Sequence, residues 1–202
     1  MKRSRKRIAL AQLLLLAVSV FAVASIGRFA GASPAAVDNH GHGNHAGKSH
    51  HELAQLRRAT ARFHDVNEAI AAGYQLGWVN GANVRILTGC VSNLADPTAG
   101  AMGYHYINPD LVADNAVDPL KPEALVYEST PDGGRKLVAV EWIVRSAQSN
   151  PPGVSEAPSV LGMTMHILVP PPGPAFYLMH AWIWKHNPSG LMSDWNPRVT
   201  CP

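Results

Sequence analysis

The first 32 residues limit which part of this chain folds and in which compartment it does so. Five basic residues among the first seven precede an apolar run from Ile8 to Gly27, and Ala30-Gly31-Ala32 then offers the small residues of a cleavage site. This is the layout of a secretory signal peptide. The run is also long enough to span a bilayer, so an uncleaved N-terminal anchor is the alternative. Both predict a secreted, periplasmic or cell-envelope protein that touches the membrane only through an uncleaved N-terminal segment.

The charge of the chain changes sign when this segment is set aside. The 202-residue sequence has 17 basic and 14 acidic side chains, a net charge of +3. Residues 1–32 hold six of the basic side chains and none of the acidic ones, so the remainder has a net charge of −3. A chain without a basic surface cannot release counterions from a phosphate backbone, so we expect no nucleic-acid partner.

Two cysteines, Cys90 and Cys201, are present in the whole sequence. In an exported chain without a third cysteine to compete, a disulfide between them is the expected state. A closed loop of this length stabilises the fold by about 4–5 kcal/mol in the chain-entropy model. No CxxC or CxxCH motif occurs, which excludes a thioredoxin-like redox pair and a c-type haem attachment site.

Histidines are concentrated just before the predicted domain. Residues 33–49 are rich in Ala, Gly, Asn and His and have too little apolar content to pack, so they predict a flexible linker. Five of the ten histidines lie in or next to it: His40, His42, His45, His50 and His51. Flexible imidazoles collect Zn, Cu or Ni with modest affinity, so the tract is either a metal-collecting segment or a solvated spacer.

A helix is predicted over about residues 50–72. Ser49 and Glu52 have the spacing of a capping box, and Gly73 stands where a left-handed C-cap belongs. A mostly apolar stripe recurs at three- and four-residue steps: Leu53, Leu56, Thr60, Phe63, Asn67 and Ile70.

The rest of the chain has the pattern of strands. Runs rich in β-branched and aromatic residues occupy 101–107, 124–129, 136–144, 160–169 and 176–184. Pro131-Asp132-Gly133-Gly134 predicts a hairpin turn, and no second helical pattern separates the strands. We therefore predict an α+β fold in one domain of residues 50–202, with an N-terminal amphipathic helix packed on an antiparallel β-sheet or small open β-barrel and one disulfide.

Glu141 is the one carboxylate of the 136–144 strand, whose two faces are otherwise apolar. In plain alternation it shares a face with Leu137, Ala139 and Ile143. An ionised carboxylate in such a strand is costly unless it is paired, protonated or bound to a metal. Pairing with Arg145, Arg85 or His180 is the alternative that needs no metal.

Histidines on the other strands offer partners for Glu141. His105, Glu141 and His180 predict a set of two imidazoles and one carboxylate, with His166 and Glu128 as substitutes. Such sets hold zinc or non-haem iron with open coordination positions. In this interpretation Glu141 is the anionic ligand or a general base, and the histidines are neutral ligands.

Copper is a competing interpretation, because Met163-Thr164-Met165-His166 places two thioethers next to an imidazole. Soft thioether ligands with imidazole suit Cu(I). Methionines also fill gaps in hydrophobic cores, and Met163 and Met165 lie on one face of the predicted strand, as core residues do.

Three segments together carry a resemblance to known sequences: GAMGYHY from Gly100, PEALVYE from Pro122, and the stretch from His180-Ala181-Trp182-Ile183-Trp184 through Asn187-Pro188-Ser189-Gly190 to Trp195-Asn196-Pro197-Arg198-Val199-Thr200-Cys201. The chain resembles a family of exported bacterial proteins of about this length. The resemblance implies a single exported domain, and it implies no activity, ligand set or cofactor.

Three functions agree with these observations. The first is an exported domain that binds a transition metal (Zn, Cu or Fe) or a small ligand through His105, Glu141 and His180. The second is a non-catalytic envelope protein that handles metal with its His-rich linker. The third is a metal-free interaction or structural domain. No complete catalytic motif is present, and the sequence leaves open whether the protein is an enzyme.

Overall fold

The computed structural model describes residues 42–169 and 175–202, with side chains from residue 50 onward. The predicted signal segment and His40 lie outside the described residues. Within the described part of the chain, no helix is both long and apolar enough to cross a membrane.

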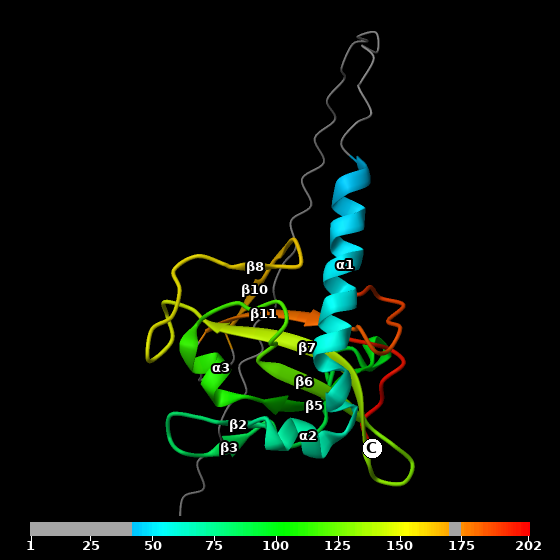
Figure 1. The fold of residues 1–202 in the computed structure, drawn as a ribbon. Helices are drawn as coiled ribbons and strands as arrows, with labels where there is room; N and C mark the ends of the chain where they lie inside the picture. Colours follow the sequence, from blue (N-terminus) through cyan, green and yellow to red (C-terminus); the bar gives the residue numbers. More distant parts are fainter. Residues whose placement is uncertain (1–41, 170–174) are drawn as a thin grey trace, which may run out of the picture. The chain divides into compact units, whose positions relative to one another are not determined.

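An antiparallel sheet forms the centre of the fold (Figure 1). Its strand order is β1-β5-β6-β7-β11-β10, and β4 also pairs with β5. The strands are β1 (Gln75–Leu76), β4 (Val91–Ser92), β5 (Ala101–Ile107), β6 (Ala124–Ser129), β7 (Arg135–Arg145), β10 (His166–Leu168) and β11 (Phe176–Ala181). Two short ribbons lie outside it: β2 (Trp78–Val79) with β3 (Arg85–Ile86), and β8 (Ser159–Val160) with β9 (Met163–Thr164). The predicted α+β class with an antiparallel sheet is confirmed.

The β6–β7 hairpin has the predicted turn. The Thr130 N–H donates to the Gly134 carbonyl, and the Gly133 N–H donates back to Thr130. Gly133 has φ +81°, a conformation that suits glycine. Strands β5 and β6 have the predicted bounds, whereas the predicted 160–169 strand divides into parts of β8, β9 and β10, with Leu161 and Gly162 both at positive φ between β8 and β9.

A β-bulge in β7 changes which side chains share a face. Val126 pairs with Ala139 while Tyr127 pairs with Leu137, so Val138 is an extra residue on β7. Leu137 therefore packs with Val140 rather than with Ala139. The plain alternation that places Leu137 on the face of Glu141 is wrong for this reason.

The predicted single helix of residues 50–72 is instead three elements. They are α1 (His42–Thr60), a 3₁₀ turn η1 (Ala61–His64) and α2 (Val66–Ala71). The break lies at Asp65, whose side chain accepts a hydrogen bond from the Asn67 N–H and so caps α2. The helical phase restarts there, which leaves Ile70 53% exposed instead of in the predicted stripe. Because α1 begins at His42, Ser49 lies inside the helix and is not its N-cap. Gly73, at φ +94°, ends α2 as predicted.

Two apolar clusters cover opposite faces of the sheet. On what we call the helix face, Leu137, Val140, Trp142 and Val144 pack with Leu56 and Phe63 of the N-terminal helical segment. On the other, the tail face, Val126, Val138, Ala139 and Trp182 pack with Val199 and Cys201 of the C-terminal tail (185–202). In Figure 1, α1 passes across the strands, and the tail is the red segment.

A disulfide joins Cys90 to Cys201, as predicted, across a sequence separation of 111 residues. It fastens the end of the tail beside β4. Two further hydrogen bonds, exchanged between the backbones of Ala101 and Asn196, hold the tail against β5. The 3₁₀ turn η2 (Pro97–Ala99) precedes β5, and helix α3 (Pro109–Asp114) follows it.

Candidate metal centre

Glu141 and His180 meet because their strands pair in register. Glu141 of β7 is directly opposite His180 of β11, and directly opposed residues of an antiparallel pair project from the same face. The two side chains contact at 3.4 Å, between His180 Nδ1 and Glu141 Oε1. The pair therefore follows from strand register.

His105 reaches Glu141 from two strands away. Ile107 of β5, Ala124 of β6 and Glu141 of β7 are aligned across the sheet, with His105 two residues from Ile107 on the same face. His105 Nε2 lies 3.6 Å from Glu141 Oε2. Strands two apart are separated by about 9–10 Å, so both side chains must extend over β6 to meet. On β6, Ala124 lies opposite Glu141 and Val126 lies opposite His105.

The three side chains are buried. Their exposed fractions are 5% for His105, 4% for Glu141 and 1% for His180. Nδ1 of His105 and both ring nitrogens of His180 have no hydrogen-bond partner among the described residues. The contact between His180 Nδ1 and Glu141 is close enough for ionic attraction but lacks hydrogen-bond geometry. A cluster of buried polar atoms without partners is unusual in a folded protein and calls for an explanation.

Burial and mutual proximity shift the ionisation of these groups in definite directions. Burial lowers the pKa of His105 to about 4, with a smaller opposing effect from Glu141. Burial acts to raise the pKa of Glu141, but His180 and His105 outweigh it and the net direction is downward. At neutral pH the site therefore holds a carboxylate beside a neutral imidazole, the forms that bind metal ions.

The donor spacing agrees with a compact metal site. One nitrogen from each imidazole and one carboxylate oxygen lie within 4.8 Å of one another. Ligand bonds of about 2.0–2.2 Å in tetrahedral geometry place donor atoms about 3.3–3.5 Å apart. The two contacts to Glu141, at 3.4 Å and 3.6 Å, are close to this spacing, although each histidine contacts a different oxygen of the carboxylate. Three protein ligands leave at least one position for water or a substrate.

The tail and Trp182 enclose one side of the site. The Trp182 ring stacks on His180, with ring centroids 5.7 Å apart and planes inclined by 24°. The Trp182 indole N–H donates to the Ser193 carbonyl, and the Trp182 backbone N–H donates to Leu191. Trp182 thus ties the orientation of His180 to the tail.

Other residues predicted for the site lie elsewhere. His166 is half-exposed and contacts Asp194, with 3.4 Å between Nε2 and Oδ2. Glu128 pairs with Lys185 and Lys136. In the histidine tract, His50 and His51 are exposed on α1. His42 and His45 belong to the same helix, in the part without described side chains. Metal binding by the tract stays a prediction.

The methionines of the copper interpretation do not gather around the triad. Met165 and Met179 belong to the apolar cluster of the helix face. Met163 is 49% exposed. Met179 alternates with His180 on β11 and so projects from the opposite side of the sheet.

Sequence reasoning missed Glu123 and Asp194. Glu123 is buried just before β6, where its Oε2 accepts the Ile143 N–H at 3.0 Å. Burial raises its pKa to about 8. Its position beside a predicted strand was a usable signal. Asp194 lies among turns of the tail, where no periodic pattern shows which residues come together.

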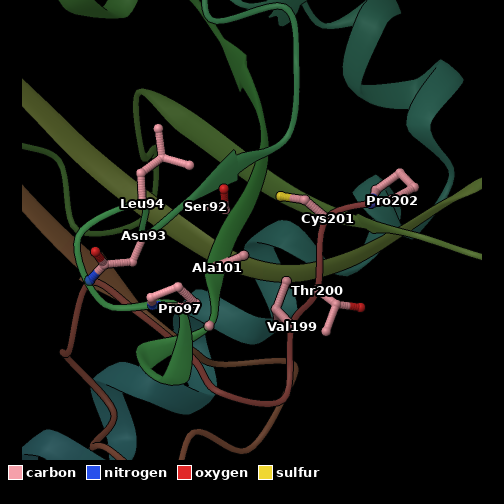
Figure 2. Close-up of a pocket in the computed structure, with 10 residues that line it drawn as sticks. Ser92, Asn93, Leu94, Pro97, Ala101, Val199, Thr200, Cys201 and Pro202 are labelled. Atoms are coloured by element: carbon pink, nitrogen blue, oxygen red, sulfur yellow. The ribbon is translucent and has the colours of Figure 1, made fainter.

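A surface pocket of about 400 Å³ lies apart from the triad. Figure 2 shows Ser92, Asn93 and Leu94 on one side and Val199, Thr200 and Cys201 on the other, next to the disulfide. Cys201, predicted for the disulfide, lines this pocket, whereas His105, Glu141 and His180 do not.

Comparisons of the chain with protein-family models, with curated proteins and with solved structures found no significant match.

Proposed function

We propose that this protein is an exported domain that binds one transition-metal ion through His105, Glu141 and His180. The observation that carries the proposal is the convergence of these three side chains in a buried site where three imidazole nitrogens have no hydrogen-bond partner among the described residues. A metal ion would bind one nitrogen of each imidazole and would offset the cost of burying the Glu141 charge. The bound ion would act as a Lewis acid on a ligand in its open position.

The donor set favours zinc or non-haem iron. Two imidazoles and one carboxylate are the ligands of catalytic zinc sites and of the facial triad that holds Fe(II). Thioether donors, which would favour Cu(I), belong to the opposite face in Met165 and Met179. Glu141 serves as the anionic ligand in this proposal.

We also propose that the domain works outside the cytoplasm. The Cys90–Cys201 disulfide supports this location, because disulfides persist in oxidising compartments. The basic and apolar layout of residues 1–32 supports it independently. The proposed partners are a metal ion or a small molecule, with no nucleic acid, and the membrane only if the N-terminal segment is retained.

The decisive experiment measures metal bound to the exported, untagged protein after dialysis against Zn²⁺ or Co²⁺. We expect one ion per chain in the wild type and substoichiometric binding in Glu141→Gln, which keeps the shape but removes the charge. Glu128→Gln is the matched control, because it neutralises a strand carboxylate that is paired with lysines instead. The visible spectrum of bound Co²⁺ reports the coordination geometry directly.

A second variant separates the triad from the histidine tract. Replacing all five histidines between residues 40 and 51 with alanine leaves the triad intact, so one ion per chain should remain. Loss of the ion in this variant together with its retention in Glu141→Gln would assign binding to the tract. Absence of stoichiometric metal from every sample would reject metal binding and favour a metal-free structural role.

A further inference from the structure

A second pair of donor atoms stands on the same face as the buried triad. His166 of β10 is directly opposite Leu178 of β11, and Leu178 is two residues before His180. Opposed residues share a face, so His166 projects from the same face as His180. Such diagonal neighbours have Cα atoms about 7–8 Å apart, within reach of long side chains.

This second pair is open to solvent. The side chains of His166 and Asp194 are 46% and 33% exposed, while their nearest donor atoms lie 3.4 Å apart. Imidazole nitrogen and carboxylate oxygen are donors for the same metals as the triad.

Asp194 belongs to the segment that encloses the triad. Its neighbour Ser193 accepts the indole N–H of Trp182, and Trp182 stacks on His180. The outer pair therefore joins the exposed edge strand β10 to the tail beside the buried ligands. Each triad residue is at most 5% exposed, so an ion from solvent must first pass more exposed residues, such as this pair, to reach the triad.

We propose that His166 and Asp194 form an outer metal-binding pair through which an ion exchanges between solvent and the His105–Glu141–His180 triad, an inference that rests on the proposed function. An aqua ion binds Nε2 of His166 and a carboxylate oxygen of Asp194 and gives up water in exchange. It then transfers to the three buried donors. Two ligands hold the ion weakly, so the pair accelerates exchange without retaining the ion.

The test is stopped-flow measurement of Co²⁺ loading into metal-free full-length protein, with release measured into excess chelator. His166→Gln and Asp194→Asn should each slow both loading and release by about tenfold, the scale on which loss of one metal-orienting partner acts. The equilibrium affinity for Co²⁺ should not change, because a residue that acts only on the route of the ion changes the loading rate and the release rate by the same factor. His64→Gln is the matched control, since His64 is an exposed histidine of η1 beside Trp184, which belongs to the helix-face cluster.

The remaining outcomes overturn the inference in distinguishable ways. Weaker affinity with faster release in His166→Gln would show that His166 is a resident ligand. Unchanged rates in both variants would show that ions enter elsewhere. Failure of the wild type to take up Co²⁺ would reject the proposed metal site itself, and the outer pair with it.

Discussion

The two faces of the central sheet differ in how far their buried polar groups have hydrogen-bond partners. On the helix face, three large buried aromatic side chains have partners for their polar atoms. Tyr74 and Tyr127 donate their hydroxyl groups to the carbonyls of Pro122 and Phe63, at 2.8 Å and 2.7 Å. Trp142 donates its indole N–H to Asp118. Protein atoms alone satisfy the hydrogen-bonding groups of these three side chains, whereas Nε of Arg135, which lies over Tyr104 of the same cluster, has no hydrogen-bond partner among the described residues.

The tail face buries polar groups that the described protein atoms leave unsatisfied. His105 and His180 have three ring nitrogens without hydrogen bonds, around a carboxylate that is 4% exposed. Leaving a buried polar group unpaired costs about 1–3 kcal/mol. A core assembled for stability alone would avoid a cluster of this kind. The difference supports the proposal of a functional site on the tail face, and changes to either face test it.

The largest expected effects come from two tryptophans, one on each face. Trp142→Ala and Trp182→Ala should each lower the free energy of unfolding by about 3–5 kcal/mol, because both remove a buried indole. They should differ in metal binding. Loss of Trp182 frees the ring of His180 and should weaken Zn²⁺ affinity about 10–100-fold, whereas loss of Trp142 should leave it unchanged.

Denaturant unfolding and calorimetric Zn²⁺ titration measure the two quantities. If an alanine variant fails to fold, Trp142→Phe and Trp182→Phe repeat the comparison with a smaller cavity. Equal losses of affinity on the two faces would contradict the division of roles between them.

Much of this fold is readable from sequence, for identifiable reasons. Strands β5 and β6 combine β-branched and aromatic residues with clear turn signals, so local pattern and tertiary structure agree. The bulge at Val138 and the restart of the helix at Asp65 were missed. Both arise where a long-range pairing or a single capping hydrogen bond overrides a periodic pattern.

The site was predictable in its members but not in its geometry. Glu141 is conspicuous because a carboxylate interrupts an apolar strand, and His105 and His180 lie in other strands of the same kind. Their convergence depends on strand order, on the register that opposes Glu141 to His180, and on the register of β5, β6 and β7 that brings His105 to the same face. These are long-range properties that no local window of sequence contains.

The next effect concerns His105 and acid. Its folded pKa of about 4 lies below the ordinary value of 6.5, so the folded state favours the neutral ring. The stability that this contributes is complete above about pH 6.5 and is lost as pH falls towards 4. We expect chelator-treated protein to lose about 3 kcal/mol across this window, at about 1.4 kcal/mol per unit of pKa shift.

Urea unfolding at half-unit pH steps measures this dependence, and His105→Gln should flatten it. Glu141, whose folded pKa is lowered, adds a separate loss below its own ordinary value of 4.5. Tyr127→Phe, on the helix face, is the control and should keep the wild-type slope. A His105→Gln variant with the wild-type slope between pH 6.5 and 4 would show that another group causes the acid sensitivity.

The last comparison is between two buried carboxylates, Glu141 and Glu123. The imidazoles around Glu141 lower its pKa, whereas burial raises the pKa of Glu123 to about 8. A group with a raised folded pKa stabilises fully below its ordinary value of 4.5, and this contribution is lost as pH rises through 8. Glu123→Gln stays uncharged and still accepts the Ile143 N–H, so its free energy of unfolding should exceed that of the wild type at pH 8, and the gain should shrink as pH falls towards 4.5. Glu141→Gln should show no such gain, since the folded state favours its ionised form.

Thermal unfolding of chelator-treated wild type and both variants at pH 5 and pH 8 measures the difference. A gain for Glu141→Gln equal to that for Glu123→Gln would mean that the two histidines do not favour the charge of Glu141, and the argument for an anionic ligand there would fail.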